Sequence, residues 1–311
     1  MRLPFLLSVL LLNFTAIAAE DKKQSEWNVS SPPGERREIP LDVRSGTWMS
    51  VDVSPDGRRI AFDLLGDLYE LPIEGGEARS LSSGMAWDMQ PRYSPDGARI
   101  AFTSDRAGGD NLWIMNADGS APRQVTKEDF RLPNNAVWHP AGRYLAARKH
   151  FTTRRSLGTG EIWLYSTEGG EGVQLVKRPS EEFQKELGEP AFSPDGRYVY
   201  FTQNSSPGNT FEYAQDVNKA VFSIRRFELA NSKIDVAVEG SGGAVRPTPS
   251  PDGRYLAYVR RLRTKDAFET ALFLKDLCSR ASVRTHARSF TSDLRAANSP
   301  RPCGRWSRAC T

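Results

Sequence analysis

An all-β fold is predicted by three observations in this 311-residue sequence. One turn, Ser-Pro-Asp-Gly or a close variant, occurs five times along the chain. A short run with alternating apolar residues follows each copy, and a second run with a central aromatic residue comes after it. The 25 Gly and 20 Pro favour tight turns between short strands over helices. The composition, 39% hydrophobic and 26% charged, is that of a soluble globular protein.

Each repeat begins at a turn with well-defined local chemistry. Proline presets the first corner, a Ser or Asp side chain caps the turn, and Gly takes the position with positive φ. Alternate residues of the following strand point to opposite faces, and both faces are apolar, as stacked sheets require. The five copies are VSPDGRRIAF (53–62), YSPDGARIAF (93–102), WHPAGRYLAA (138–147), FSPDGRYVYF (192–201) and PSPDGRYLAY (249–258).

The spacing of the repeats predicts propeller blades. The turn prolines lie 40, 45, 54 and 57 residues apart. Strand-rich repeats of about 40–45 residues are typical of propellers, so the wider spacings predict blades with insertions. Each blade is expected to contain a third strand whose central aromatic residue fills the space between blades. These five aromatic residues, predicted to share one slot, are Tyr69, Trp113, Trp163, Phe222 and Phe273.

An outer, fourth strand is predicted in only four of the five units. It is expected at 78–81, 122–126, 173–176 and 234–238. The sequence therefore predicts about five recognisable blades within 46–277 and an incomplete ring. Propellers commonly close when an N-terminal strand completes the last blade. Within the N-terminal segment 19–45, REIPLDV (37–43) is the candidate for this strand, and GTWMSVDV (46–53) is expected to begin the first blade.

The N-terminus has the layout of a secretory signal peptide. Arg2 precedes an apolar run that ends at Leu12, and a small-residue cleavage signature ends at Ala18. The run is shorter than the roughly 20 apolar residues that span a bilayer, so a cleaved signal (1–18) is favoured over a membrane anchor. We therefore expect a periplasmic or secreted protein with no transmembrane segment after cleavage.

The sequence changes character at Cys278. The tail 278–311 holds all three Cys, seven Arg and one acidic residue, and it has no Lys and no strand-like alternation. The rest of the chain has a net charge of −2, so nothing global favours binding to nucleic acid or an anionic membrane. The tail fits a disordered basic segment, a cysteine-stapled appendage or, our preferred hypothesis, translation in a shifted frame.

An unfinished ring, with exposed strand edges and exposed faces on its end blades, also predicts poor solubility or self-association of the chain.

Longer blocks carry a more specific resemblance. Residues 83–126 resemble the TolB-like propeller repeats of periplasmic proteins. Blocks similar to a narrower group of exported proteins, in which the propeller precedes a metal-dependent amidohydrolase domain, are 83–126, 147–165, 185–201, 210–229 and 242–261. The resemblance covers about residues 26–277. It implies that this chain is the truncated leading part of such a protein.

The resemblance implies a non-catalytic role: binding, or gating access to, a neighbouring hydrolase domain or protein partner. A zinc-type centre, implied only for the absent hydrolase domain, would need several His, two of them one residue apart. This chain has His139, His150 and His286, none in that spacing, and no Gly-x-Ser-x-Gly elbow. We therefore predict no catalytic, cofactor or metal site here. The alternatives are a stand-alone TolB-like periplasmic adaptor for protein–protein interaction and the propeller lid of a serine peptidase.

A candidate binding rim is predicted where two blades carry insertions. The insertion 147–161 gathers four basic residues around Phe151, which suits contact with a partner domain or an anionic group. Pairing with acids such as Glu161 or Asp105 would instead make it an ordinary solvated loop. The segment 211–216 lengthens the next unit and is expected at the same rim. The candidate residues are Arg148, Lys149, Arg154, Arg155, Glu212, Tyr213 and Asp216.

Overall fold

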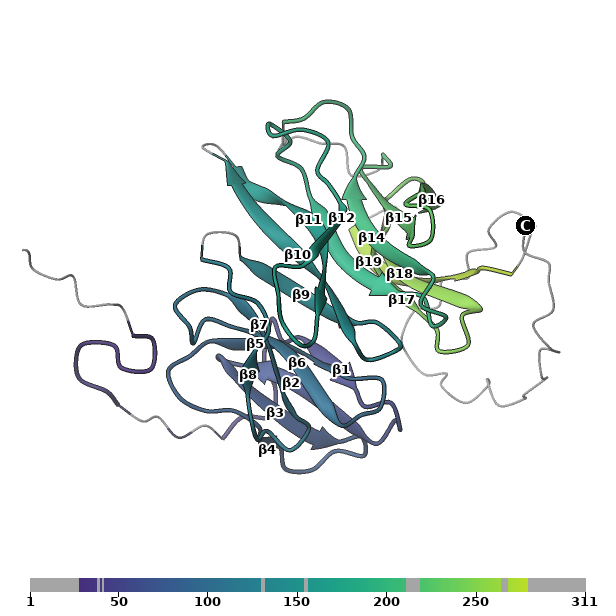
Figure 1. Cartoon of the computed structure of the whole chain (residues 1–311). Coiled ribbons are helices and arrows are strands. Elements are labelled where there is room, and N and C mark those ends of the chain that lie inside the picture. Colours follow the sequence, from purple (N-terminus) through teal and green to yellow (C-terminus); the bar gives the residue numbers. More distant parts are fainter. Residues whose placement is uncertain are drawn as a thin grey trace, which may run out of the picture.

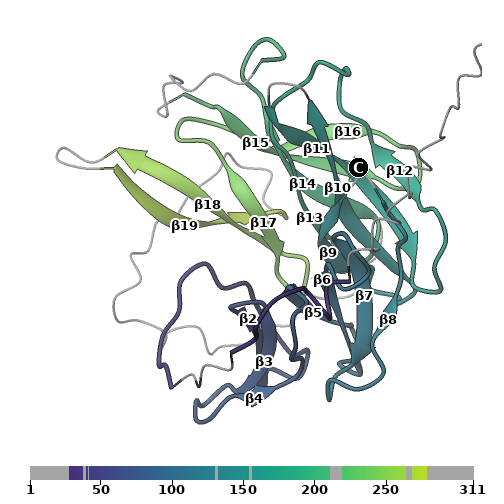
Figure 2. The same cartoon turned by 90° about the vertical axis from the view of Figure 1, so that its left-hand side faces the viewer.

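The computed structural model describes residues 28–37, 40, 42–129, 132–153, 156–210, 219–263 and 268–278. These residues form nineteen strands in five antiparallel sheets and no helix. The sheets stand side by side around a common centre (Figures 1 and 2). The predicted all-β propeller with five blades is confirmed. The described part contains no helix that is long and apolar enough to cross a membrane. The predicted signal peptide (1–18) and the tail after Cys278 lie outside the described residues.

Each sheet is a meander in which the strands follow one another in chain order. The first sheet contains β1 (Val51–Val53), β2 (Arg59–Leu64), β3 (Asp67–Pro72) and β4 (Arg79–Ser80). The second contains β5 (Asp88–Tyr93), β6 (Arg99–Ser104), β7 (Asn111–Asn116) and β8 (Arg123–Gln124). The third contains β9 (Pro133–Trp138), β10 (Tyr144–Thr153), β11 (Ser156–Ser166) and β12 (Val173–Val176). The fourth contains β13 (Leu187–Phe192), β14 (Tyr198–Asn204), β15 (Phe222–Glu228) and β16 (Ile234–Val238). The fifth contains β17 (Val245–Pro249), β18 (Tyr255–Arg263) and β19 (Phe268–Asp276).

The repeated turns have the predicted chemistry. In the first copy the Ser54 hydroxyl donates to the Asp56 carboxylate, and the Gly57 N–H donates to the Ser54 carbonyl at 2.8 Å. Gly57 has a φ of 71°, and the equivalent glycines of the other copies lie between 69° and 71°. His139 replaces the serine in the third copy, where its Nδ1 accepts the Ala141 N–H at 3.0 Å. In each sheet, therefore, one glycine with a left-handed backbone ends the turn that leads into the second strand.

The core lies between the sheets. We call the face of a sheet toward the preceding sheet its leading face, and the face toward the following sheet its trailing face. At the junction of the second and third sheets, Ala101 and Ile114 of a trailing face pack with Leu145 and Tyr165 of the next leading face. Similar clusters join each pair of consecutive sheets. The alternation of residues along each strand thus supplies apolar side chains to both faces of each inner sheet.

The predicted aromatic slot is occupied as expected in four sheets. Its residues lie opposite the same position of the second strand in each sheet: Tyr69 opposite Phe62, Trp113 opposite Phe102, Trp163 opposite Ala147 and Phe273 opposite Tyr258. The prediction is wrong for Phe222, which lies opposite Asn204. Arg225 holds the slot instead, opposite Phe201. A long connection precedes β15, and Phe222, the first residue of that strand, lies three residues before the slot.

The described sheets form an open arc. Contacts join them in order from the first to the fifth, and the first and fifth share no contact of comparable extent. The first and last sheets stand at the two ends of this arc in Figure 2. On the trailing face of the fifth sheet Leu274 is 47% exposed, whereas its equivalent Ile114 in the second sheet is 2% exposed. The two end sheets therefore each have one face without a neighbouring sheet.

The N-terminal approach to the first sheet differs from the prediction. The strand expected over 46–53 is confined to Val51–Val53. Of the segment 37–43, the described residues 37, 40, 42 and 43 lie in no strand, and residues 38, 39 and 41 lie outside the description. These described residues therefore add no strand to the three-stranded fifth sheet.

Candidate functional site

The structure places two of the seven predicted rim residues, and both are paired with acids. Arg148 contacts the Glu186 carboxylate with both terminal nitrogens, at 3.1 and 3.2 Å. Lys149 Nζ lies 2.7 Å from the Glu128 carboxylate and 4.2 Å from the centre of the Trp163 ring. Their side chains are only 15% and 12% exposed. These two cations therefore hold neighbouring elements together rather than presenting free charge.

The other five predicted rim residues lie outside the described residues; they are Arg154, Arg155, Glu212, Tyr213 and Asp216. β10, which ends at Thr153, and β11, which begins at Ser156, form a long hairpin. This hairpin projects beyond the neighbouring strands in Figure 1.

A second group of polar residues, not predicted from the sequence, lines the centre of the arc. The first strands of consecutive sheets contact one another, so they surround the axis. In sheets two to five this strand has a bulge, where two residues face one residue of the second strand. The first bulge residue has a left-handed backbone: Gln90 (58°), Asn135 (52°), Glu189 (52°) and Arg246 (57°). Such conformations are uncommon outside glycine and gather at functional positions. We call these four residues the axial set.

Side chains near the axis connect three of the four bulges to the sheet before them. Asp63 Oδ2 accepts the Gln90 N–H at 2.7 Å. Gln90 Oε1 accepts the Asn135 N–H at 2.7 Å. Glu189 Oε2 accepts the Arg246 N–H at 2.9 Å. These bonds satisfy amides that the bulges remove from the strand ladder, and they fix the spacing of the inner strands.

Opposite charges meet where the third and fourth sheets face the axis. Burial raises the pKa of Glu186, the Arg148 guanidinium opposes this effect, and the nearby charge of Glu189 adds to it. The Glu189 carboxylate also accepts a hydrogen bond from Thr202 Oγ1 at 2.7 Å. Arg246 Nε lies 3.4 Å from the Glu189 carboxylate, and Arg246 is still the most exposed member of this cluster, with 76% of its side chain accessible. The axis therefore offers amides, carboxylates and one accessible guanidinium, which suits a ligand that both donates and accepts hydrogen bonds.

The described residues contain no group of three or more His, Cys, Asp or Glu placed to hold a metal ion. His139 serves the turn of the third unit, and its ring packs edge-on against Phe192 at 5.0 Å. His150 lies in β10, and His286 falls outside the described residues.

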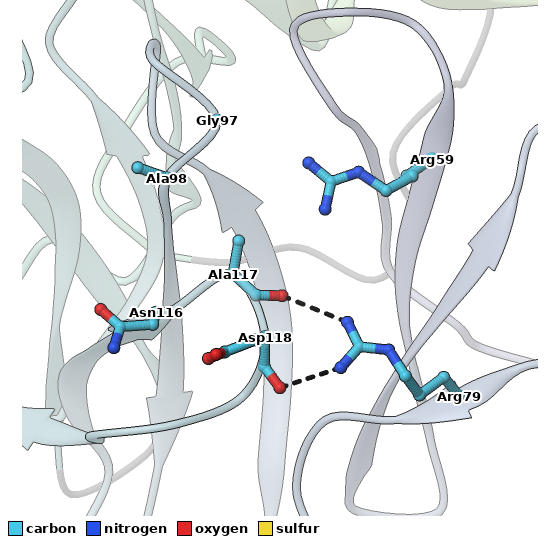
Figure 3. A pocket seen from close by; sticks show the side chains of 7 residues that line it. All are labelled: Arg59, Arg79, Gly97, Ala98, Asn116, Ala117 and Asp118. Carbon is cyan, nitrogen blue, oxygen red and sulfur yellow. Dashed lines mark hydrogen bonds between the residues drawn. The ribbon is translucent and has the colours of Figure 1, made fainter.

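A shallow cavity of about 320 Å³ lies between the first two sheets (Figure 3). Arg59 and Arg79 line one side, and Asn116 and Asp118 line the other. Arg79 donates to the Asp118 carbonyl at 2.9 Å and to the Glu70 carboxylate at 2.8 Å. Because Arg59 also pairs with Glu70, at 3.1 Å, one buried carboxylate serves both cations. We therefore interpret the cavity as a structural feature, and we call Arg59, Glu70 and Arg79, which join the first sheet to the second, the inter-sheet clamp.

Comparison with known proteins supports the fold seen here. The family model for the TolB beta propeller domain matches residues 33–159. The chain contains a TolB-like β-propeller domain. The solved TolB structure from Acinetobacter baumannii superposes with a TM-score of 0.52, at 15% identity, over 73% of this chain and 49% of that one. At this identity the likeness concerns the fold alone.

Curated relatives of the TolB-like propeller include peptidases. An uncharacterized peptidase, YuxL of Bacillus subtilis, is 30% identical over 172 residues, which cover 53% of this chain and 23% of that protein. Tricorn protease homolog 1 of Streptomyces coelicolor is 30% identical over 92 residues, covering 30% of this chain and 9% of that protein. The chain thus matches less than a quarter of the length of either relative.

The axial set carried a weak signal in the sequence. Each member lies five residues before a turn proline, and proline directly follows Gln90, Glu189 and Arg246. The four residues share no residue type, so an alignment on identical letters does not reveal them. Their left-handed backbone and their position at the axis emerge only from strand register.

Proposed function

We propose that this chain is a non-catalytic TolB-like propeller that binds extended polypeptide at its axis and gates access to a hydrolase of the peptidase class. The observation that carries the proposal is the match to relatives named as peptidases, confined to a minor part of each relative. Because the matching segment is a small part of each relative, we infer that it handles the substrate and that the hydrolytic residues lie elsewhere in those proteins. The propeller lid of a peptidase is thus the version that the relatives favour.

The chemistry of the axis supports a polypeptide ligand. Backbone peptide groups present a donor and an acceptor at every residue. The half-buried amides of Gln90 and Asn135 supply both kinds of partner, and Arg246 supplies an accessible cation for a carboxylate. We expect short acidic peptides, or peptides with a free C-terminus near Arg246, to bind best.

A neighbouring amidohydrolase domain is the second candidate, supported by the blocks at 83–126 and 242–261. In that version the zinc-type metal belongs to the hydrolase domain, outside the residues of this chain. Both versions share an exported location, which rests on the signal-like residues 1–18. The rim residues Arg154, Arg155, Glu212, Tyr213 and Asp216 would then contact the hydrolase or another protein partner.

Peptide binding without cleavage tests the proposal. Fluorescein-labelled casein peptides would be titrated with the purified full chain and followed by fluorescence anisotropy, with mass spectrometry to detect cleavage with and without added zinc. We expect saturable binding and intact peptides. Arg246→Ala is expected to weaken binding about tenfold, because it removes a charged hydrogen bond worth about 1.4 kcal/mol.

Arg197→Ala is the matched control, since Arg197 is also exposed (62%) but belongs to a turn of the fourth unit. It should leave the affinity unchanged. Absence of binding, or equal losses in the two variants, would refute the axial site. Cleavage of the peptides by this chain would refute the non-catalytic role.

A further inference from the structure

Among the described residues, the fifth sheet ends in a long strand that has no outer neighbour. In the other four sheets a fourth strand covers the third, whereas β19 is the last strand of its sheet among the described residues. β19 has nine residues and contains neither Pro nor Gly. Its centre, 270–274, has the sequence TALFL and no charge. Proteins normally protect edges of this kind with short strands, proline or charged residues, because a bare edge is a template for strand pairing.

The equivalent positions of other sheets show which backbone groups of β19 face outward. Leu68 and Leu112 occupy the position equivalent to Leu272, as strand register shows. The Leu68 carbonyl accepts the Leu81 N–H at 2.7 Å, and the Leu112 carbonyl accepts the Val125 N–H at 2.8 Å. The N–H groups of both leucines also bond outward, to hydroxyl groups that follow the fourth strand. The N–H and C=O of Leu272 therefore both point away from β18.

This geometry fits a strand of the same kind running in the opposite direction. Two copies of β19 centred on Leu272 would exchange two N–H···O=C bonds between their Leu272 residues, the pattern of a hydrogen-bonded antiparallel pair. Thr270 of each copy would then lie opposite Leu274 of the other.

The exposed apolar residues of the fifth sheet add to this fit. Leu272 and Leu274 lie on the trailing face and are 39% and 47% exposed. A two-fold axis perpendicular to the sheet keeps both trailing faces on the same side. The four leucines of two copies would then form one continuous apolar strip, in which each shields its neighbours from water.

We propose that the chain forms a two-fold symmetric dimer in which β19 pairs with β19 of a second copy, giving one six-stranded antiparallel sheet. The interface is isologous, so it closes at two copies and does not propagate into a fibre. It uses the outer edge of the arc and leaves the axial set free, so it is independent of the proposed function.

Symmetric disulfide cross-linking tests the register of this dimer. In a full chain carrying Cys278→Ser, Cys303→Ser and Cys310→Ser, Leu272→Cys would be oxidised at low protein concentration and examined on a non-reducing gel. Opposed residues of a hydrogen-bonded pair have Cα atoms about 5.5 Å apart, within the range a disulfide accepts. We expect a covalent dimer as the main product, and the unmodified chain should sediment at twice the monomer mass.

Leu274→Cys in the same background is the matched control. Residue 274 is similarly exposed, but its two copies would be about four residues apart along the paired strands, or roughly 13 Å. It should remain mainly monomeric on the gel. A monomer at all concentrations would overturn the proposal, as would pairing by residues of the chain that follow β19. Equal cross-linking of Leu272→Cys and Leu274→Cys would overturn it too, because it indicates unspecific association.

Discussion

At the scale of single residues, Glu70 ties the first sheet to the second. Its side chain is 10% exposed and accepts hydrogen bonds from Arg59, Arg79 and the Tyr93 hydroxyl, the last at 2.7 Å. Burial raises the pKa of Glu70, but the hydrogen bonds from Arg79 and Tyr93 and the charge of Arg59 together hold it below its ordinary value. The ionised carboxylate therefore stabilises the folded chain.

Replacing this carboxylate should change both stability and its dependence on pH. A lowered pKa in the folded state means that the stabilisation is present above about pH 4.5, the ordinary value for Glu, and is lost as the pH falls through the folded pKa. Glu70→Gln is expected to lose about 2 kcal/mol of unfolding free energy at pH 7, because buried donors lose a charged acceptor. Urea unfolding between pH 3 and pH 7 measures this.

The matching control is Glu168→Gln, since Glu168 is 85% exposed and lies 3.9 Å from Arg123. It should change the unfolding free energy by less than about 0.5 kcal/mol. Equal effects of the two substitutions, or an unchanged acid limb in Glu70→Gln, would show that the clamp contributes little.

The rim cations and the axial set have features that depend on contacts between units and are not visible in the sequence. The rim cations were visible as a cluster of like charge, but their partners Glu186 and Glu128 come from other units, so their neutralisation followed only from the fold. The axial set was invisible for a related reason. A left-handed polar residue serves the bulge whether it is Gln, Asn, Glu or Arg, so the repeat preserves the position and not the residue.

At the scale of elements, the turns were the most predictable part of the molecule. Ser-Pro-Asp-Gly, which occurs four times, and its variant His-Pro-Ala-Gly each favour one local conformation, so all five turns form without reference to the rest of the chain. Phe222 shows the opposite case, because its slot is set by pairing with β14 across a long connection. The length of β1 likewise depends on what packs beside the first sheet, and within the described part of the chain one face of that sheet has no neighbouring sheet.

Two equivalent turn glycines separate backbone strain from packing. A Cβ at Gly57 would meet no atom within 4 Å, whereas at Gly196 it would lie 2.7 Å from His139 Nε2. Both glycines have a φ of 71°, so both substitutions carry the same left-handed cost of about 1–2 kcal/mol. Gly57→Ala should lose about that amount, and Gly196→Ala should lose more, because the His139 ring is packed against Phe192. Thermal unfolding of the two variants would check this, and a smaller loss for Gly196→Ala would contradict the contact.

At the scale of the whole molecule, the sheets behave as a stack with two unequal ends. The repeat in the sequence was sufficient to predict five blades, because each blade carries the same signals, and the five described sheets form an open arc. The repeat does not show what covers the outer faces of the first and fifth sheets, because the residues on those faces are of the same types as residues on buried faces elsewhere in the chain. Leu272 and Leu112 differ in what covers them and not in type.

Hydrogen–deuterium exchange distinguishes an open arc of five sheets from a closed ring. The second strand of each sheet, β2, β6, β10, β14 and β18, would be followed by mass spectrometry of peptides from the dilute full chain. We expect β6, β10 and β14 to exchange slowest, because their sheets are covered on both faces, and β2 and β18 to exchange clearly faster. Equal protection of all five strands would show instead that the sheets form a closed ring.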